Sequence, residues 1–491
     1  MEDETSPWCV LKFGGTSLAT PERWHRLGDI VIRRLKRGEN PLLVCSAVSG
    51  TTDDLEALPN LARSDRRARI AGIRERHDRL RRALGLDRVA GFEGQFRELE
   101  ALALETRDGS WDPKTRARLL AQGELLSTRL GAAWLASRGV DVRWLDARDM
   151  LHAGGPARAE RDFLSAECDY AFSSAARRDL DRGGADAVIT QGFLARDASG
   201  ETVVLGRGGS DTAAAYFASR IGAKRVEIWT DVPGLFTANP RVVPDARLIR
   251  RLTYDEAETL AAMGAAALHP RSIRPVREAG VPMEIAWTDR PELEGTRIAS
   301  GAGDPGIKAI SSRTGLCLVS MRRPSSWQPV GFMADIAECF RRHELCMDLI
   351  SSSPSDIRST VDLEADPGAP GRMDELMRNL NQVSKASLIP DVSSVSMVGR
   401  EIRSVLPTVA ETLQHLEGHE IHLLAQSAND YSLTYVTARD SALPLVRAIH
   451  TDLFGDAPAC GTFGPSWDRL TRTVPDPGKS RAPASAMAAA S

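Results

Sequence analysis

The chain has 491 residues, enough for about three domains of ordinary size. Its hydrophobic fraction of 42% and charged fraction of 26% exclude a wholly disordered, collagen-like or coiled-coil protein. A net charge of −3 gives no field for non-specific nucleic-acid binding, and no apolar run approaches the roughly 18 residues of a membrane span. The start is acidic and the seven cysteines contain no CxxC pair, so we expect a cytoplasmic protein without a disulfide framework or zinc site.

Strand-like and helix-like segments alternate through the first 300 residues. Thr20 followed by Pro21 predicts a helix start, and the Arg- and Glu-rich segment 61–107 predicts a helical insert. Buried strands are predicted by apolar runs at 8–11, 41–45, 140–145, 187–189 and 226–229. This alternation favours a mainly parallel sheet covered by helices on both faces.

Small, turn-forming residues at 299–308 predict a linker, after which the pattern changes. Strands are expected at 316–321, 346–351, 360–363, 392–398, 421–425 and 432–436, and helices at 331–343, 373–380, 405–416 and 442–453. Two successive units of this β-α-β-β-α type predict a pair of ferredoxin-like modules. We place them at 310–388 and 390–460, after a catalytic domain at 8–300 and before a disordered tail at 475–491.

The first candidate site is the segment Lys12–Ser17, which reads KFGGTS between a strand and a helix. Gly14 and Gly15 allow a sharp turn that brings backbone N–H groups close to an anion, and Lys12 adds a mobile positive charge. Taken alone, the segment fits a phosphate site and an ordinary tight turn about equally well.

The second candidate site is Leu205–Asp211, which reads LGRGGSD before the strong helix former at 212–218. A helix N-terminus carries free N–H groups and favours a nearby anion. Arg207 adds a bidentate donor for phosphate or carboxylate. An ordinary capped helix is the alternative, but two glycine loops that each carry a cation favour two facing anion sites. Such sites suit a nucleoside triphosphate and an acidic co-substrate.

Six motifs occur in one order along the chain: KFGGTS at 12–17, GELLST at 123–128, LGRGGSD at 205–211, WTDVPG at 229–234, NPR at 239–241 and LHPRS at 268–272. In sequence and order they resemble the motifs of the aspartate kinases, which belong to the amino-acid kinase superfamily. The resemblance implies a three-layer α/β catalytic domain with a mainly parallel sheet, followed by two ACT-type regulatory modules of ferredoxin-like α+β fold.

The resemblance also implies a reaction, the transfer of the ATP γ-phosphoryl group to the β-carboxylate of L-aspartate. The product, 4-phospho-L-aspartate, is the first intermediate towards lysine, methionine and threonine. Lys12 would bind the transferring phosphate with Gly14 and Gly15, and Asp211 would orient Lys12. A carboxylate nucleophile is ionised at neutral pH, so no general base is needed and His269 is interpreted as structural.

Further roles follow from the resemblance. Thr52 and Glu124 would hold aspartate, Glu124 through the amino group, and Arg207 would pair with a substrate carboxylate. Mg²⁺ would arrive with ATP, bound mainly through phosphate oxygens and water. The nucleotide would be surrounded by Thr230, Asp231, Phe236 and Arg241.

The chain departs from the family at three positions. Ala266 stands where the family has a lysine near the nucleotide, Phe236 stands where tyrosine is typical, and Gly50–Asp53 reads GTTD where GVTN is usual. Loss of one buried charge-assisted contact costs about 1.5–3 kcal/mol, which predicts weaker nucleotide binding. We therefore expect Ala266→Lys to lower the KM for ATP, and an unchanged KM would show that another group fills the position.

A regulatory site is implied with less support from the residues themselves. Asp348, Ser352 and Ser353 match positions that bind the feedback inhibitor in lysine-sensitive relatives, although Pro354 replaces an expected acidic residue. A plain polar loop is the alternative. The resemblance further implies inhibition by lysine or threonine and a homodimer or larger assembly.

Two other functions stay open at this point. The chain fits another amino-acid kinase, acting for example on an acetylated glutamate, although Glu124 and the tandem modules argue against it. It also fits a kinase-like protein with a weakened site that senses amino acids as a regulatory subunit, a hypothesis motivated by Ala266 and Phe236. The segment Phe463–Trp467 is open to interpretation as the remnant of a fusion to another enzyme.

Overall fold

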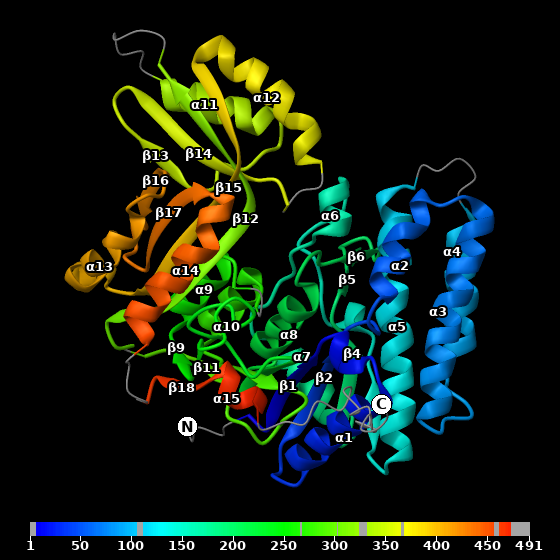
Figure 1. The fold of residues 1–491 in the computed structure, drawn as a ribbon. Helices are drawn as coiled ribbons and strands as arrows, with labels where there is room; N and C mark the ends of the chain where they lie inside the picture. Colours follow the sequence, from blue (N-terminus) through cyan, green and yellow to red (C-terminus); the bar gives the residue numbers. More distant parts are fainter. Residues whose placement is uncertain are drawn as a thin grey trace, which may run out of the picture.

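The computed structural model describes residues 6–105, 111–265, 268–301, 303–323, 331–364, 368–455 and 461–472. Figure 1 shows a catalytic part, coloured from blue to green, and a regulatory part, coloured from yellow-green to orange. Ala266 and the tail predicted at 475–491 lie outside the described residues. In the described part of the chain, no helix is both long and apolar enough to span a membrane.

An eight-stranded sheet forms the centre of the catalytic part, in the order β3-β4-β2-β1-β7-β10-β11-β9. Every neighbouring pair from β3 to β10 is parallel, and β11 is antiparallel to β10. The predicted mainly parallel sheet is therefore confirmed. The strands are β1 (Trp8–Phe13), β2 (Asn40–Cys45), β3 (Val142–Trp144), β4 (Ala187–Gln191), β7 (Arg225–Thr230), β9 (Arg251–Leu252), β10 (Met283–Trp287) and β11 (Thr296–Ile298).

Helices cover both faces of this sheet, because alternate residues of its strands are buried on opposite sides. On β1, Leu11 packs in one apolar cluster with Trp24 and Trp134, whereas Val10 packs in another with Phe217. The first cluster involves α1 (Pro21–Leu35), α2 (Thr51–Ala57), α3 (Arg63–Ala83), α4 (Phe92–Glu105) and α5 (Pro113–Ser137). The second involves α7 (Ser174–Arg182), α8 (Gly209–Arg220), α9 (Tyr254–Ala262) and α10 (Ile273–Ala279). Figure 1 shows α3 and α4 standing beside α5, as expected of a helical insert.

Smaller elements complete the catalytic part. Thr20 caps α1 by accepting a hydrogen bond from the Arg23 backbone N–H, as its position before Pro21 predicts. The remaining elements are α6 (Glu160–Leu164), the hairpin β5 (Leu194–Arg196) and β6 (Thr202–Val204), and β8 (Arg247–Ile249).

The regulatory part is one six-stranded sheet in the order β13-β14-β12-β15-β17-β16. Its strands are β12 (Gly306–Arg322), β13 (Ile350–Ser352), β14 (Asp356–Asp362), β15 (Lys385–Arg400), β16 (Ile421–Gln426) and β17 (Ser432–Ala438). Its helices are α11 (Phe332–Arg342), α12 (Ala369–Val383), α13 (Leu406–Thr412) and α14 (Arg439–Phe454). The two ferredoxin-like modules share this sheet.

The long strands β12 and β15 pair antiparallel along their whole length, with register shifts around Arg313–Leu316. The second half of β12 pairs with β14, and the second half of β15 pairs with β17, so each long strand serves both modules. Strand β12 begins at Gly306, so the last residues of the predicted linker 299–308 are strand. The domain limits at 310 and 388–390 stay predictions, and both strands run across them.

One predicted strand is largely wrong. The segment expected at 346–351 forms regular strand only as β13, from Ile350. The backbone pairing slips by one residue before β13, because the Thr360 carbonyl accepts the Asp348 N–H (3.0 Å) and the Leu349 N–H donates to the Thr360 hydroxyl (3.0 Å). The regular ladder of β13 and β14 therefore begins at Ile350, opposite Ser359.

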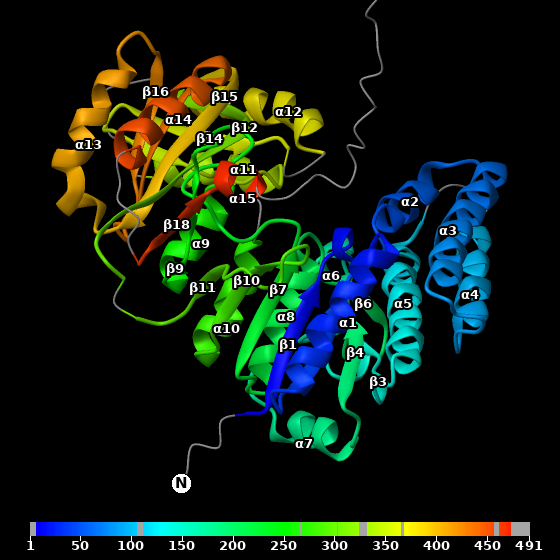
Figure 2. The same cartoon turned by 60° about the horizontal axis from the view of Figure 1, so that its bottom comes forward.

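The C-terminal segment returns to the catalytic part. Strand β18 (Phe463–Ser466) pairs antiparallel with β8, and α15 (Trp467–Arg472) follows it (Figure 2). The Trp467 ring lies 5.6 Å from the Phe236 ring and 6.1 Å from the Trp287 ring, measured between centroids. This segment is thus an integrated element of the fold.

Candidate active site

A charged pair marks the candidate site at the carboxyl end of the parallel strands. Lys12 comes from the end of β1 and Asp211 from the first turn of α8, and the lysine Nζ lies 2.6 Å from the aspartate Oδ1. The two side chains are 12% and 15% exposed, so the pair is partly shielded yet open to a ligand. Ligands of open α/β sheets bind at this end of the strands.

The two glycine loops approach their neighbours too closely for side chains. A Cβ on Gly15 would lie 2.8 Å from the Ala47 carbonyl oxygen in the loop after β2. Gly208 caps α8 in a left-handed conformation (φ 64°), and a Cβ there would collide with the His269 ring. Glycine at these positions keeps both loops free of side chains that would collide with their neighbours, and in the first loop the Gly14 N–H donates to the Trp229 carbonyl (3.5 Å).

Glu124 on α5 is the buried carboxylate of the site, only 3% exposed. Its Oε2 accepts hydrogen bonds from the backbone N–H groups of Gly192 (2.7 Å) and Phe193 (2.6 Å), and its Oε1 accepts one from the Ser210 hydroxyl (2.9 Å). Burial raises the pKa of this carboxyl to about 7, while the three hydrogen bonds and the nearby Lys12 charge oppose the rise. A carboxylate has about four acceptor positions, so one remains for a cationic ligand.

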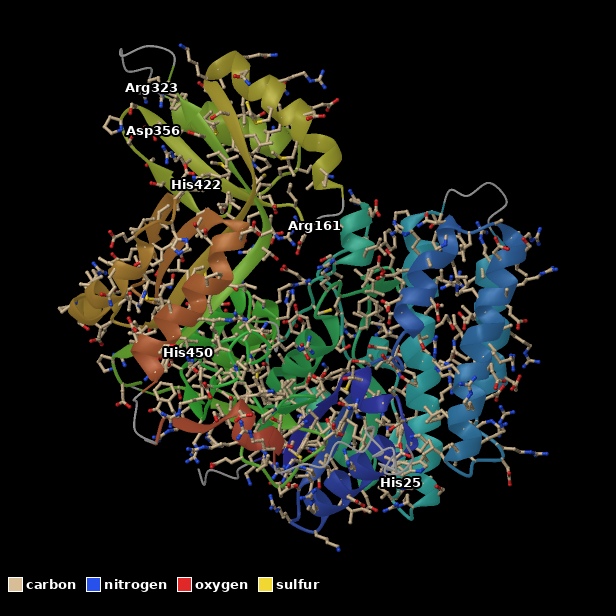
Figure 3. The ribbon with its side chains drawn as sticks, viewed as in Figure 1. His25, Arg161, Arg323, Asp356, His422 and His450 are labelled. Carbon is tan, nitrogen blue, oxygen red and sulfur yellow. The ribbon has the colours of Figure 1, made fainter. Side chains whose placement is uncertain are left out.

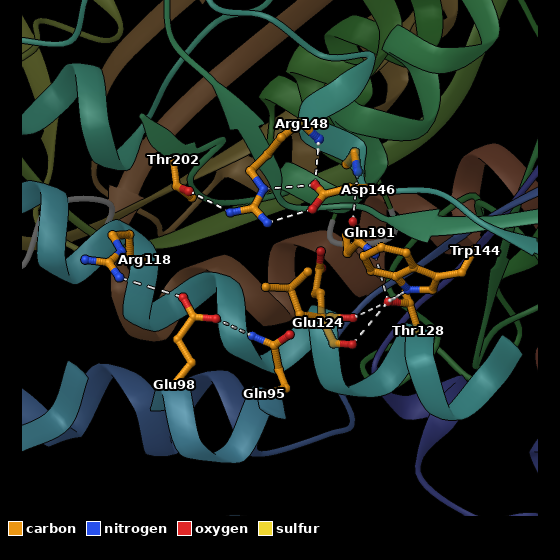
Figure 4. A network of polar contacts seen from close by, with 12 residues as sticks. Gln95, Glu98, Arg118, Glu124, Thr128, Trp144, Asp146, Arg148, Gln191 and Thr202 are labelled. Carbon is orange, nitrogen blue, oxygen red and sulfur yellow. Dashed lines mark hydrogen bonds and ion pairs between the residues drawn. The ribbon is translucent and has the colours of Figure 1, made fainter. Parts of the chain in front are cut away.

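A polar network fixes the turn of α5 that carries Glu124 (Figure 4). The Thr128 hydroxyl donates to the Glu124 backbone carbonyl (2.7 Å) and accepts from the Gln191 amide (2.9 Å) and the Trp144 indole N–H (3.1 Å). Gln191 in turn accepts from the Ala147 N–H (2.8 Å). The GELLST motif therefore supplies both the carboxylate and the residue that anchors its backbone.

The other two predicted substrate residues, Thr52 and Arg207, come from separate elements. Thr52 is the second residue of α2, and its neighbour Thr51 packs against α5, where a Cβ on Gly123 would lie 3.4 Å from the Thr51 methyl. Arg207 is exposed in the loop before α8 and forms no ion pair or hydrogen bond with any residue that the structure describes. Its guanidinium is therefore available to a ligand.

The comparisons with known proteins agree with this geometry. The model of the amino acid kinase family matches residues 7–286. The lysine-sensitive aspartokinase 3 of Escherichia coli is 30% identical over 453 residues, which cover 91% of this chain and 99% of the relative. The chain belongs to the aspartate kinase family. An aspartokinase of Chlamydia trachomatis is 29% identical, with 92% of this chain and all of the relative covered.

Solved structures of aspartate kinases share the whole architecture. The structure of E. coli aspartokinase III in complex with aspartate and ADP (R-state) gives a TM-score of 0.80 at 29% identity, covering 91% of this chain and 99% of that chain. The lysine and aspartate complex of the same enzyme (T-state) gives a TM-score of 0.73 at 28% identity, with 91% and 100% covered. These likenesses confirm the predicted catalytic domain with regulatory modules.

The residues predicted at the nucleotide of this aspartate kinase fall into two groups. Thr230 and Asp231 end β7, with 3.2 Å between the threonine hydroxyl and a carboxylate oxygen, and Asp231 and Arg241 are exposed. Phe236 is only 7% exposed, and its ring packs edge-on against Trp467. Phe236 therefore belongs to an apolar cluster between the catalytic and regulatory parts.

His269 has a structural position, as expected. Its Nδ1 accepts the Arg271 backbone N–H (3.3 Å) and so caps the short turn Pro270–Ser272. Burial lowers the pKa of this imidazole, which favours the neutral form that can accept. Its neighbour Arg271 holds the second glycine loop by donating to the carbonyls of Leu205 (2.8 Å) and Ala166 (2.8 Å). Sequence reasoning missed this role of Arg271, although the LHPRS motif contains it.

Sequence reasoning also missed a serine pair. The Ser46 hydroxyl donates to the Ser210 hydroxyl (3.0 Å), which donates to Glu124. Ser210 lies inside the LGRGGSD motif, so the motif itself was the available signal. Ser46 directly follows β2. Its position at the carboxyl end of a parallel strand is the feature of the sequence that could have indicated this role.

The predicted effector residues lie at the two ends of β13. The Asp348 carboxylate, before the strand, pairs with Arg313 (2.7 Å) at the register shift of β12. Ser352 ends the strand, and the Ser353 hydroxyl donates to the Asp356 carboxylate (2.8 Å) in the turn that follows (Figure 3). The structure therefore places Asp348 apart from the two serines along the strand.

Proposed function

We propose that this chain is an ATP-dependent aspartate kinase, which transfers the γ-phosphoryl group of ATP to the β-carboxylate of L-aspartate. The observation that carries the proposal is the Lys12–Asp211 pair, which lies between two glycine loops on the face where the buried Glu124 carboxylate is held. The E. coli relative crystallised with aspartate and ADP has the same fold over 91% of this chain.

The phosphoryl transfer needs alignment and charge neutralisation more than proton transfer. A β-carboxylate oxygen attacks the γ-phosphorus, the bond from that phosphorus to the bridging oxygen breaks, and ADP leaves with the electron pair. Lys12 would stabilise the charge on the transferring oxygens, and Gly14 and Gly15 would present their N–H groups to the phosphates. Asp211 would hold the Lys12 ammonium in place across 2.6 Å.

The aspartate substrate would be held by opposite charges at its two ends. The ionised Glu124 would accept the substrate ammonium, and Arg207 would pair with a substrate carboxylate. Thr52 would add a hydroxyl at the start of α2. The serine pair would keep the Glu124 carboxylate in one orientation.

Mg²⁺ would be bound as part of the nucleotide substrate. The described residues contain no group of three or more His, Cys, Asp or Glu side chains that could hold a metal alone. Mg²⁺ in nucleotide sites is coordinated mostly by phosphate oxygens and water, so it would need few protein ligands here. Asp231, which follows β7 and lies beside Thr230, is an exposed carboxylate in this region. The ion would neutralise phosphate charge.

The regulatory proposals rest on the family. We infer inhibition by lysine or threonine through Asp348, Ser352 and Ser353, a homodimer or larger assembly, and a cytoplasmic location. The E. coli relative is named as lysine-sensitive and was crystallised with lysine, which favours lysine.

A direct assay tests the proposal. Hydroxylamine traps an acyl phosphate, so incubation with Mg-ATP and L-aspartate should give aspartyl hydroxamate, and lysine or threonine should suppress it. Absence of product at high ATP would leave the amino-acid-sensing subunit as the better hypothesis. Product from an acetylated glutamate in place of aspartate would favour the other kinase class.

A further inference from the structure

A second cavity lies where the catalytic part meets the regulatory sheet. It has a volume of about 370 Å³, within the usual range of small-molecule sites, and it shares no lining residue with the candidate active site. Its wall is built from β9, the segment after β11, the start of β12 and the residue before β18, which Figure 2 shows close together. Its charged side chains are Arg251, Glu256, Arg297, Asp304 and Lys308, and Thr253, Ser300 and Thr462 add hydroxyl groups.

Lys308 is the unusual member of this wall. Its side chain is buried, with 6% of the residue exposed, yet it forms no ion pair or hydrogen bond with any residue that the structure describes. Glu256 lines the same cavity but forms no ion pair with Lys308, and the Glu256 Oε2 accepts the N–H (2.8 Å) and hydroxyl (3.0 Å) of Thr253. A lysine that lines a cavity without a direct partner is available to an anionic ligand.

The backbone holds Lys308 in this position. Ile307 pairs with Gly399 and Ala309 with Val398, so Lys308 is the extra residue of a β-bulge. A Cβ on Gly399 would collide with the Gly306 carbonyl oxygen, and Gly306 itself has φ 129°. Bulges redirect a side chain and occur often beside functional sites.

The remaining charged side chains of the wall differ in whether they have a partner. Arg297 pairs with Glu284 (2.9 Å), but Arg251 is exposed at the rim and forms no ion pair or hydrogen bond with a described residue. Asp304 contacts only the Thr462 hydroxyl at 3.5 Å. Lys308 and Arg251 thus have no ion-pair partner in the described structure, and the same wall carries two carboxylates, Glu256 and Asp304.

We propose that this cavity binds a small anion, whose carboxylate or phosphate group is held by Lys308 and Arg251. The bound anion connects β9 of the catalytic part with β12 of the regulatory sheet, and so forms an effector site separate from β13. The proposal goes beyond the kinase function and does not depend on it.

Calorimetric titration of the full chain tests the site, with inorganic phosphate and glutarate as separate probes. These two probes distinguish a phosphate ligand from a carboxylate ligand. Binding of either should weaken about tenfold or more in Lys308→Met. It should persist in Lys12→Met, which removes the active-site cation, and in Lys385→Met, an exposed lysine at the start of β15.

Equal binding by the wild type and Lys308→Met, or no binding of either probe to the wild type, would overturn the proposal. If Lys308→Met fails to fold, the rim variant Arg251→Gln takes its place with the same expected loss. Loss of binding only in Lys12→Met would assign the anion to the kinase site and likewise overturn the proposal.

Discussion

The two halves of the candidate active site are built differently. The phosphate half, formed by Lys12–Ser17, Leu205–Asp211 and Glu124, is held by direct polar contacts between the end of β1, the start of α8 and the middle of α5. The nucleotide half, formed by residues 230–241, packs against distant segments. Phe236 contacts Trp467, and the Thr237 hydroxyl lies 2.8 Å from His450 of α14, 213 positions along the chain (Figure 3).

This difference indicates which half of the site the regulatory part can influence. Burial lowers the pKa of His450 to about 4, so the imidazole is neutral, and its Nε2 shares a hydrogen bond with the Thr237 hydroxyl. The nucleotide half is therefore coupled to the regulatory sheet and the C-terminal segment, while the phosphate half is held within the catalytic part. Substitutions in the two halves should separate into losses of turnover and losses of nucleotide affinity.

The largest effect is expected from Lys12→Met. The variant removes the cation beside the transferring phosphate, and loss of one such electrostatic contact lowers kcat by about a hundredfold to a thousandfold. Lys36→Met, at the exposed end of α1, is the matched control and should keep its turnover. Steady-state kinetics of both variants check this, and a Lys12→Met enzyme with near-normal kcat would place the chemistry elsewhere.

A pH profile of the KM for aspartate tests the role of Glu124. Its folded pKa is raised from the ordinary 4.5 to about 7, so the carboxylate is charged above pH 7 and becomes protonated as the pH falls through 7. The KM should therefore rise about tenfold per pH unit below that point, since only the charged form binds the substrate ammonium. A KM that is flat from pH 8 to pH 5.5 would exclude this role.

The same shift has a consequence for stability. An acid whose pKa is raised on folding binds its proton more tightly in the folded state. The free energy of unfolding should therefore decrease as the pH rises from 4.5 through 7. Glu124→Gln should lose the part of this pH dependence that comes from Glu124. Denaturant unfolding at several pH values measures it.

Trp467→Ala tests the nucleotide half. The change removes the ring contacts with Phe236 and Trp287, which support the chain after β7 and after β10. We expect the KM for ATP to rise about tenfold with little change in kcat, and Trp467→Phe should restore most of the affinity because a ring remains. A variant that loses only kcat would contradict the expectation that the nucleotide half controls ATP affinity and the phosphate half controls turnover.

The smallest effect is expected from Phe236→Tyr. The added hydroxyl enters an apolar cluster, and an unpaired buried hydroxyl costs about 1–3 kcal/mol. The midpoint of thermal unfolding should therefore fall by a few degrees while the KM for ATP stays within about twofold. A lower KM with unchanged stability would instead place this ring at the nucleotide, as the family motif implies.

The sequence predicted β1, β2, β3, β4 and β7 of the catalytic sheet because the information is local, but not β9, β10 and β11. Strands β1, β2, β4 and β7 contain short buried apolar runs, and Thr20–Pro21 marks the start of α1 in the residues themselves. The two glycine loops were predictable for the same reason, since they lie in compact motifs next to strand or helix ends, whereas Glu124 lies in the middle of α5 and was found through the GELLST motif.

Other features depend on packing between distant residues and leave no local pattern. The burial of Phe236 depends on Trp467, and the burial of Lys308 depends on a bulge opposite Gly399. The interruption before β13 depends on two hydrogen bonds that Thr360 accepts, from the N–H groups of Asp348 and Leu349. No periodicity in the chain reports contacts of this kind.

The most direct test of the account compares aspartyl hydroxamate formation by the wild type and Lys12→Met, with Mg-ATP and L-aspartate at saturation. The account predicts steady product from the wild type and at least a hundredfold less from the variant, with both proteins folded by circular dichroism. Equal rates, or no product from the wild type at any ATP concentration, would contradict it.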